Sequence, residues 1–248
     1  MDRAAVRIRD TLLGGAIDHV VISGDLTERG RRTELARFEE LFGPLQRAGR
    51  LSIVPGNHDR LTDDVGARIM RGGRVETHTV PGLHIVRVDS TGPHNKFLLA
   101  GHGEICEAVL DGIDAALAAA PPEHLVAVVL HHHPLALPEE TFPERLATRL
   151  GWPWATELAL GLDLLQRIRG RCDLVLHGHR HIPRSTTLWA GDARPLRMYN
   201  AGCTTALGRF RLFAHADGKL LSPAGWFDVR RVSPLPRPVE RRTGMEMR

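Results

Sequence analysis

Short apolar runs of strand length alternate with stretches of helical periodicity through the first two thirds of the 248-residue sequence, and this alternation constrains the fold most strongly. The run DHVVIS at 18–23 and the run LSIVP at 51–55 flank a longer stretch at 32–48. That stretch places five apolar side chains on one helical face, which are Leu35, Phe38, Leu41, Phe42 and Leu45. A strand, a helix and a second strand in this order predict a β-α-β unit and parallel strands.

The same order recurs further along the chain. We expect strands at 83–90, 124–132 and 172–179, and helices within 104–119 and near 156–169. From residue 184 on, short strands dominate, which are RSTTLWA, PLRMYNAG, GRFRLFAH and GWFDVRR. The pattern therefore predicts an α/β sandwich whose second half is more antiparallel.

Length and composition fit one domain over residues 1–230, followed by a basic, proline-containing, disordered tail over 231–248. Hydrophobic residues make up 42% of the chain, yet no apolar run approaches the roughly 20 residues that cross a bilayer. The N-terminus also lacks the apolar core and cleavage site of a signal peptide. We therefore expect a cytoplasmic protein with no membrane partner.

Cysteine and charge exclude two further classes of protein. The three cysteines form no CxxC spacing, which argues against a disulfide framework and a cysteine zinc site. The net charge is +4, but nearly all of the 33 basic residues are scattered arginines, and much of the excess lies in the tail. Nucleic acid is therefore not the expected partner.

Side chains that bind metals follow four of the apolar runs, at the point where each run ends. In α/β sheets the loops beyond the carboxyl ends of strands meet in one crevice, so we expect these side chains to share a pocket. Each group taken alone also fits a turn, a helix cap or a solvated loop. Four such groups at successive strand ends favour a metal site. They are Asp25, Asn57-His58-Asp59, His131-His132-His133, and His177, His179 and His181.

Four motifs in this order resemble the calcineurin-like metallophosphoesterase superfamily, over roughly residues 5 to 215. They are GD at 24–25, GNHD at 56–59, HHP at 132–134 and GHRH at 178–181. Within the superfamily, VISGDLTERG, VPGNHD, VRVDSTG, VVLHHHPL, LHGHRH and YNAGCTT look most like the bacterial cyclic-nucleotide phosphodiesterase branch. The resemblance implies an αββα sandwich of two mixed sheets flanked by helices.

The resemblance also implies a set of metal ligands. The family's bridging carboxylate falls on Asp25, and its second metal is also held by residues that match Asn57, His132 and His179. The second histidine of GHRH, His181, belongs to the first metal. Mixed oxygen and nitrogen ligands suit divalent Mn, Fe, Zn or Co better than Mg, and the sequence does not choose among these four metals.

Two residues of GNHD match the family's catalytic machinery. His58 corresponds to the catalytic histidine that does not bind metal, and Asp59 to the partner that orients it. His131 and His133 match no family ligand, so the choice of His132 depends on its spacing from Pro134.

The family's reaction is hydrolysis of phosphodiesters or phosphomonoesters by a water that two metal ions activate. Two divalent ions about 3.5 to 4 Å apart clamp the phosphoryl group and lower the pKa of that water. The resemblance therefore implies a phosphorylated small-molecule substrate, with nucleotides and cyclic nucleotides among the candidates.

One family motif has no counterpart here. The family's first strand ends in D-x-H, two ligands of the first metal, and the residues before Gly24 contain no such motif. We therefore expect a fold that lacks the first strand, with Asp25 and His181 as the remaining ligands of the first metal. Either the natural protein starts further upstream, which we favour, or half of the site is lost. An unpaired strand edge would also favour an oligomer.

Three functions follow from these observations. The first is a binuclear phosphohydrolase whose activity in this chain depends on the missing ligands. The second is a mononuclear or catalytically impaired protein that binds metal and a nucleotide. The third is a nuclease on the same fold, which the basic isoelectric point alone favours.

Overall fold

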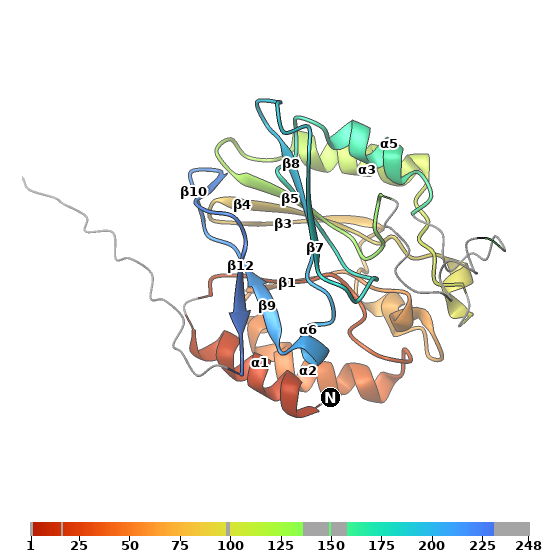
Figure 1. The fold of residues 1–248 in the computed structure, drawn as a ribbon. Coiled ribbons are helices and arrows are strands. Elements are labelled where there is room, and N and C mark those ends of the chain that lie inside the picture. The colour runs from red at the N-terminus through yellow and green to blue at the C-terminus, as the bar shows by residue number, and fades with distance from the viewer. Residues whose placement is uncertain (1, 16, 98–99, 136–148, 150–157, 231–248) are drawn as a thin grey trace, which may run out of the picture.

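The computed structural model describes residues 2–15, 17–97, 100–135, 149 and 158–230, and it arranges them in layers (Figure 1). Helices α3 (Glu107–Ala118) and α5 (Gly161–Ile168) cover one face of a six-stranded sheet. Helices α1 (Asp2–Gly14) and α2 (Arg32–Arg47) lie at the opposite side of the molecule, beyond β1 (Val20–Ile22). The order of layers is the expected αββα sandwich.

The six-stranded sheet is mixed. Strands β4, β5, β6 and β8 run parallel, whereas β3 and β7 pair antiparallel at the two edges. Every residue of β5 is buried, because a central strand is covered by another layer on each face. In spatial order the strands are β3 (Val75–Val80), β4 (Leu83–Val88), β5 (Leu125–Val129), β6 (Leu174–His177), β8 (Leu196–Asn200) and β7 (Arg184–Leu188).

The second strand layer consists of two separate pairs in the described part of the chain. β1 pairs in parallel with β2 (Leu51–Ile53), and β9 (Arg209–Leu212) pairs antiparallel with β12 (Gly225–Asp228). The apolar face of α2 packs against this layer and against Ile8 and Leu12 of α1. Short elements fill the connections, which are η1 (His58–Arg60), η2 (Val65–Arg68), η3 (Pro93–Lys96), α6 (Thr204–Leu207), β10 (His215–Ala216) and β11 (Lys219–Leu220).

The structure confirms the expected fold class and adds strands that the apolar runs did not indicate. β3 was not predicted, and neither was the small hairpin of β10 and β11. The tail at 231–248 and the first part of the helix expected near 156–169 lie outside the described residues, so the domain boundary stays a prediction. Among the helices that are described, none is long and apolar enough to span a membrane.

Candidate functional site

Four side chains from different strand ends meet at one edge of the sandwich. Asp25 follows β1 and Asn57 follows β2, while His131 follows β5 and His179 follows β6. β1 and β2 are parallel to each other, as are β5 and β6, so each pair presents its carboxyl ends together. The expected convergence of strand-end loops is therefore observed for these four residues.

The backbone at this edge adopts conformations that most residues avoid. Asp25 has φ 54° and His179 has φ 65°, in the left-handed region. Gly56 is close to Asp25, because a Cβ atom on Gly56 would lie 2.1 Å from Asp25 Oδ1. Glycine at 56 thus lets the two loops touch, and strained backbone of this kind concentrates at functional sites.

The side-chain atoms of the four residues lie close enough to bind one ion. Asn57 Oδ1 is 3.0 Å from His131 Nε2 and 3.0 Å from His179 Nδ1. His131 Nε2 is also 3.4 Å from Asp25 Oδ2. Two oxygens and two nitrogens therefore lie together at this edge, linked by these three distances, and this donor set suits a divalent transition metal.

Hydrogen bonding fixes the tautomer of His131. Its Nδ1 lies 2.7 Å from the carbonyl oxygen of Ser23, which can only accept, so Nδ1 carries the proton. The other ring nitrogen, Nε2, faces the oxygens of Asn57 and Asp25, to which it donates when the ring is protonated, and it has a lone pair when the ring is neutral. Burial opposes a charge here, yet the Asp25 carboxylate raises the pKa of His131 above its ordinary value. Despite its burial, His131 and His58 lower the pKa of Asp25 to about 2.

His132 points to a different neighbourhood. Its Nε2 is 3.0 Å from the carbonyl oxygen of Gly101, and its Nδ1 is 2.9 Å from the hydroxyl of Ser90. Both ring nitrogens thus have protein partners, and neither bonds to Asp25 or Asn57. Burial, together with His179 and His131, holds the pKa of His132 well below its ordinary value. His132 lies within 4.8 Å of the donor atoms of His131 and His179, but it is His131 that the structure brings to Asp25 and Asn57.

His58 and Asp59 do not form the expected pair. The Asp59 carboxylate is fully buried and accepts four hydrogen bonds, from the amides of Leu26, Thr27 and Gly56 and from the Thr27 hydroxyl. None of these bonds involves the imidazole of His58, whose Nδ1 instead lies 2.8 Å from the carbonyl oxygen of Glu28. Asp59 therefore holds the loops of Asp25 and Asn57 together. Burial, with the Asp25 carboxylate, raises the pKa of Asp59.

The other predicted histidines differ in position. His181 is exposed, and within the described residues its side chain forms no hydrogen bond or ring contact with the four converging residues. His133 is buried and stacks on His179 with ring centroids 5.7 Å apart. His177 is buried behind His133, with ring centroids 6.5 Å apart. Burial lowers the pKa of His133 to about 3 and that of His177 to about 4.

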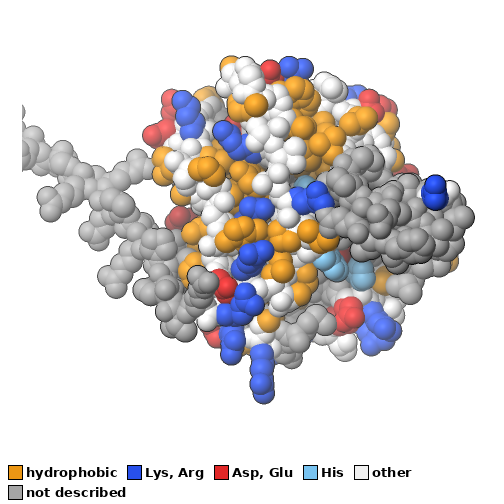
Figure 2. Space-filling model, viewed as in Figure 1, with side chains coloured by type: hydrophobic (Ala, Val, Ile, Leu, Met, Phe, Trp, Pro, Cys, Tyr) orange, Lys and Arg blue, Asp and Glu red, His pale blue; other side chains and the backbone are white. Residues whose placement is uncertain are grey.

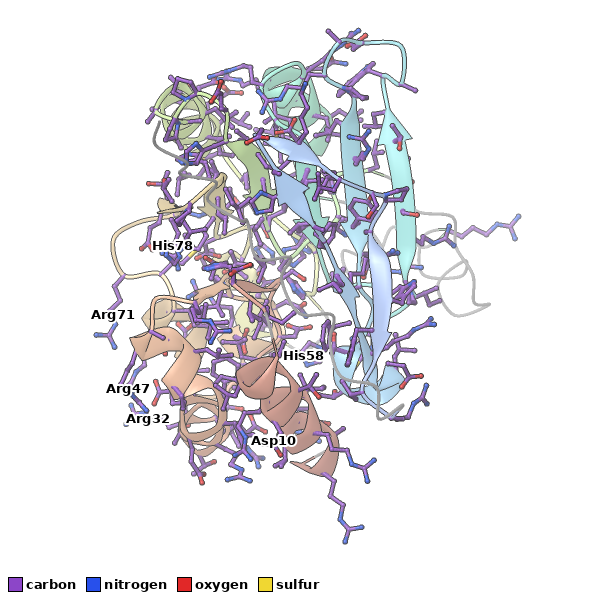
Figure 3. The ribbon with its side chains drawn as sticks, turned by 90° about the vertical axis from the view of Figure 1, so that its left-hand side faces the viewer. Asp10, Arg32, Arg47, His58, Arg71 and His78 are labelled. Carbon is purple, nitrogen blue, oxygen red and sulfur yellow. The ribbon has the colours of Figure 1, made fainter. Side chains whose placement is uncertain are left out.

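Histidine side chains are visible in one small area of the face in Figure 2, and acidic and basic side chains lie near it. His58 and His78 are labelled in Figure 3, and they lie well apart. His58 therefore belongs to this edge of the sandwich, and His78 belongs to another part of the molecule.

Sequence reasoning named His131 among the converging histidines but gave the ligand role to His132, and it did not single out Ser90. The sequence signal for His131 is its distance from the end of the strand. β5 ends at Val129, Leu130 follows it, and His131 is the next residue. All three histidine rings lie beside His179, with ring centroids 4.9 to 5.7 Å away, so their partners and not their sides distinguish them. Spacing from Pro134 did not contain this information.

Comparisons with known proteins agree with the fold. The sequence profile described as calcineurin-like phosphoesterase matches residues 3–183. No curated protein sequence matches the chain. The sulfate thiohydrolase SoxB of Thermus thermophilus is similar in structure, with a TM-score of 0.50, 15% identity, and coverage of 91% of this chain and 42% of that one. The phosphopantetheinyl hydrolase PptH of Mycobacterium tuberculosis has a TM-score of 0.41 and 17% identity, with coverage of 76% and 79%. The chain thus spans less than half the length of SoxB.

Proposed function

Because the chain belongs to the calcineurin-like phosphoesterase family, we propose that it is a metal-dependent phosphohydrolase with a metal shell formed by Asp25, Asn57, His131 and His179. This shell differs from the sequence-based set in one member, since His131 takes the place of His132. The proposal goes beyond family membership in its residues, its reaction and its substrate.

The tautomer of His131 carries the proposal. Its Nδ1 donates to the Ser23 carbonyl, so Nε2 is the ring atom directed at Asn57 Oδ1, at 3.0 Å, and at Asp25 Oδ2, at 3.4 Å. Two oxygens and one ring nitrogen at these distances need a positive charge between them, which the second proton of His131 supplies in the absence of a metal and a bound ion would supply in its place. A histidine that donates one ring proton to a backbone carbonyl and directs the other nitrogen at such a centre has the arrangement of a metal ligand.

The residues fit a divalent transition metal by chemistry as well as by position. One carboxylate, one amide oxygen and two imidazoles suit Mn, Fe, Zn or Co. Such an ion, when bound, polarises a phosphoryl oxygen and lowers the pKa of water towards neutrality.

His58 is the residue of this chain that acts on the substrate. Its Nδ1 proton is held by the carbonyl oxygen of Glu28, which leaves Nε2 free to carry a second proton or to bond the phosphoryl group. The backbone amide of His58 donates to Asp25 Oδ1 at 3.1 Å, so the ring is fixed close to the metal shell. His58 would therefore give a proton to the leaving oxygen as a general acid.

Phosphodiesters and phosphomonoesters are the proposed substrate class, with cyclic nucleotides as the first candidates because of the motifs of the phosphodiesterase branch. Bis(p-nitrophenyl) phosphate reports on the first class and p-nitrophenyl phosphate on the second. Measuring kcat/KM for these two substrates and for 3′,5′-cyclic AMP ranks the three substrates.

The metal shell is tested with the protein soaked in Mn²⁺ or Zn²⁺, freed of excess ion and analysed for metal. We expect about one ion per wild-type chain and per His78→Ala chain, and a large loss in His131→Ala, because a shell that needs all four donors binds poorly with three. Fewer than about 0.2 ions per wild-type chain would overturn the proposal. Equal metal content in His131→Ala and His78→Ala would overturn the choice of His131.

The position of His181 favours a second candidate, a mononuclear protein with weak or no hydrolytic activity. His181 is exposed and does not join the four converging residues in the described structure. Metal bound at one ion per chain, without turnover of bis(p-nitrophenyl) phosphate in added Mn²⁺, would favour this candidate over the hydrolase.

A further inference from the structure

Ser90 lies directly behind the proposed metal shell and is completely buried. Its hydroxyl oxygen accepts from the backbone amides of His131 and His132, at 3.3 and 3.2 Å, and lies 2.9 Å from His132 Nδ1. Ser90 follows β4, whereas the two histidines follow β5. One side chain thus joins the ends of two neighbouring strands.

The direction of each hydrogen bond can be deduced. The Gly101 carbonyl only accepts, so His132 Nε2 donates to it, and Nδ1 of the neutral ring must then accept. Ser90 therefore donates its hydroxyl proton to His132 Nδ1 and accepts from two amides. Every hydrogen-bonding group of Ser90 Oγ and of the His132 ring is used within the protein, and no lone pair of His132 remains for a metal.

His132 also fixes a loop. The segment 89–104 is closed by a bond of 2.9 Å from the Glu104 amide to the Ser90 carbonyl. Gly101 bonds the His132 ring, and a Cβ on Gly103 would lie 2.5 Å from His132 Cβ. Residues 101–104 therefore pack directly on the buried His132 ring.

We infer that Ser90 and His132 are positioning residues, which fix the backbone at His131, and through it the place of the His131 imidazole, and which hold residues 101–104 against the site. The inference rests on the proposed function, because it assigns His131 as the metal ligand. In this proposal neither Ser90 nor His132 supplies a metal ligand, although the His132 ring contacts the rings of His131 and His179.

The chain contains a matched control, the cluster of Ser52, His19 and His78. Ser52 is also completely buried, and its hydroxyl lies 2.9 Å from His19 Nε2 and 2.8 Å from His78 Nδ1. Ser52→Ala therefore removes a completely buried hydroxyl that bonds two imidazoles, whereas Ser90→Ala removes one that bonds a single imidazole and two backbone amides, and Ser52 lies away from the site. We name these groups the Ser52 cluster and the Ser90 cluster, the latter being Ser90, His131 and His132.

The test measures the dissociation constant of Mn²⁺ by competition with a chelator, with thermal unfolding as a check on folding. We expect Ser90→Ala to weaken Mn²⁺ binding about 10- to 100-fold, as loss of a group that orients a ligand does, and Ser52→Ala to leave it unchanged. Equal dissociation constants for the two variants would overturn the inference. Failure of the wild type to bind Mn²⁺ would instead overturn the proposed function.

Two milder variants of His132 keep the test valid if Ser90→Ala does not fold. Asparagine places an amide oxygen near the position of Nδ1 and can accept from Ser90, while glutamine places an amide nitrogen near Nε2 and can donate to Gly101. We expect His132→Asn to bind Mn²⁺ within a fewfold of the wild type, and His132→Gln to bind it about tenfold more weakly. The opposite order would contradict a role that acts through Ser90.

Nitrogen-15 spectra of the metal-free protein provide a readout that does not depend on activity. The wild type should show His131 with its proton on Nδ1. Loss of this single tautomer in Ser90→Ala, with retention in Ser52→Ala, is the expected result. An unchanged His131 spectrum in Ser90→Ala would show that Ser90 does not orient the ring.

Discussion

The Ser90 cluster and the Ser52 cluster are built from the same parts, a fully buried hydroxyl and two imidazoles, and only one of them belongs to a site. In the Ser52 cluster both rings bond the hydroxyl, and the charged groups that lower the histidine pKa values beyond the effect of burial include Arg50 and Arg87. In the Ser90 cluster one ring bonds the hydroxyl and the other directs Nε2 at Asp25. The proposed metal site is thus set apart by a ring nitrogen that faces a carboxylate, because both clusters contain two histidines.

The largest difference between the clusters should come from Asp25. We expect Asp25→Ala to lower kcat/KM for bis(p-nitrophenyl) phosphate by about 10³-fold, which is a barrier increase of about 4 kcal/mol, because the shell loses its only carboxylate. His78→Ala removes a ring of the Ser52 cluster and should leave kcat/KM within about twofold. Steady-state kinetics in added Mn²⁺ measure both. A loss of less than tenfold in Asp25→Ala would remove the distinction between the clusters.

His58 should have a smaller effect with a different signature. We expect His58→Ala to lower kcat by about 10²-fold while metal content stays near that of the wild type, because His58 acts on the leaving oxygen. The defect should shrink for good leaving groups such as p-nitrophenolate, which need little protonation. Asn57→Ala is the contrast, because excess metal should restore part of its activity. Full recovery of His58→Ala by excess metal would show that His58 is a ligand.

The smallest effect should appear in the pH dependence of stability. Burial, with His78 and Arg50, lowers the pKa of His19 from 6.5 to about 4. In the unfolded chain His19 therefore takes up a proton below about pH 6.5, whereas in the folded chain it takes one up only near pH 4. Between these two pH values protons favour the unfolded chain, so the free energy of unfolding decreases as pH falls. His19→Gln should remove about 1 kcal/mol of the decrease, after allowance for the partial exposure of the ring.

Urea unfolding at about pH 7 and about pH 4.5 measures this difference. Glutamine can keep a hydrogen bond to Ser52 without titrating, so the two proteins should have similar stability at the higher pH. An equal loss of stability on acidification in both proteins would show that His19 does not titrate in this window.

The apolar runs predicted the central strands because those strands are buried on both faces. β5 is an example, since all of its residues are buried and apolar. β3 escaped prediction because it lies at an edge, where Glu76, Thr77 and His78 break the apolar run. The sequence signal for a hairpin of β3 and β4 was the turn at Pro81 and Gly82. The alternating exposure of the β3 residues in the structure agrees with an edge strand.

The loops of the candidate site followed from the sequence, whereas the roles within two of them did not. Three consecutive histidines have the same chemistry, and only the positions of Ser23, Ser90 and Gly101 in space distinguish His131 from His132. Asp59 illustrates the same limit. Its expected partner was the neighbouring ring of His58, but the partners of its carboxylate come from Thr27, Leu26 and Gly56.

The four proposed ligands come from two different layers of the sandwich. Asp25 and Asn57 follow strands that pack on α1 and α2, whereas His131 and His179 follow strands of the six-stranded sheet. A bound ion would therefore act as a cross-link between layers, and its contribution would grow with the logarithm of the free ion concentration. Without the ion the layers could open separately at this edge, and with it they would unfold together. The cooperativity of the fold would then depend on the supply of metal.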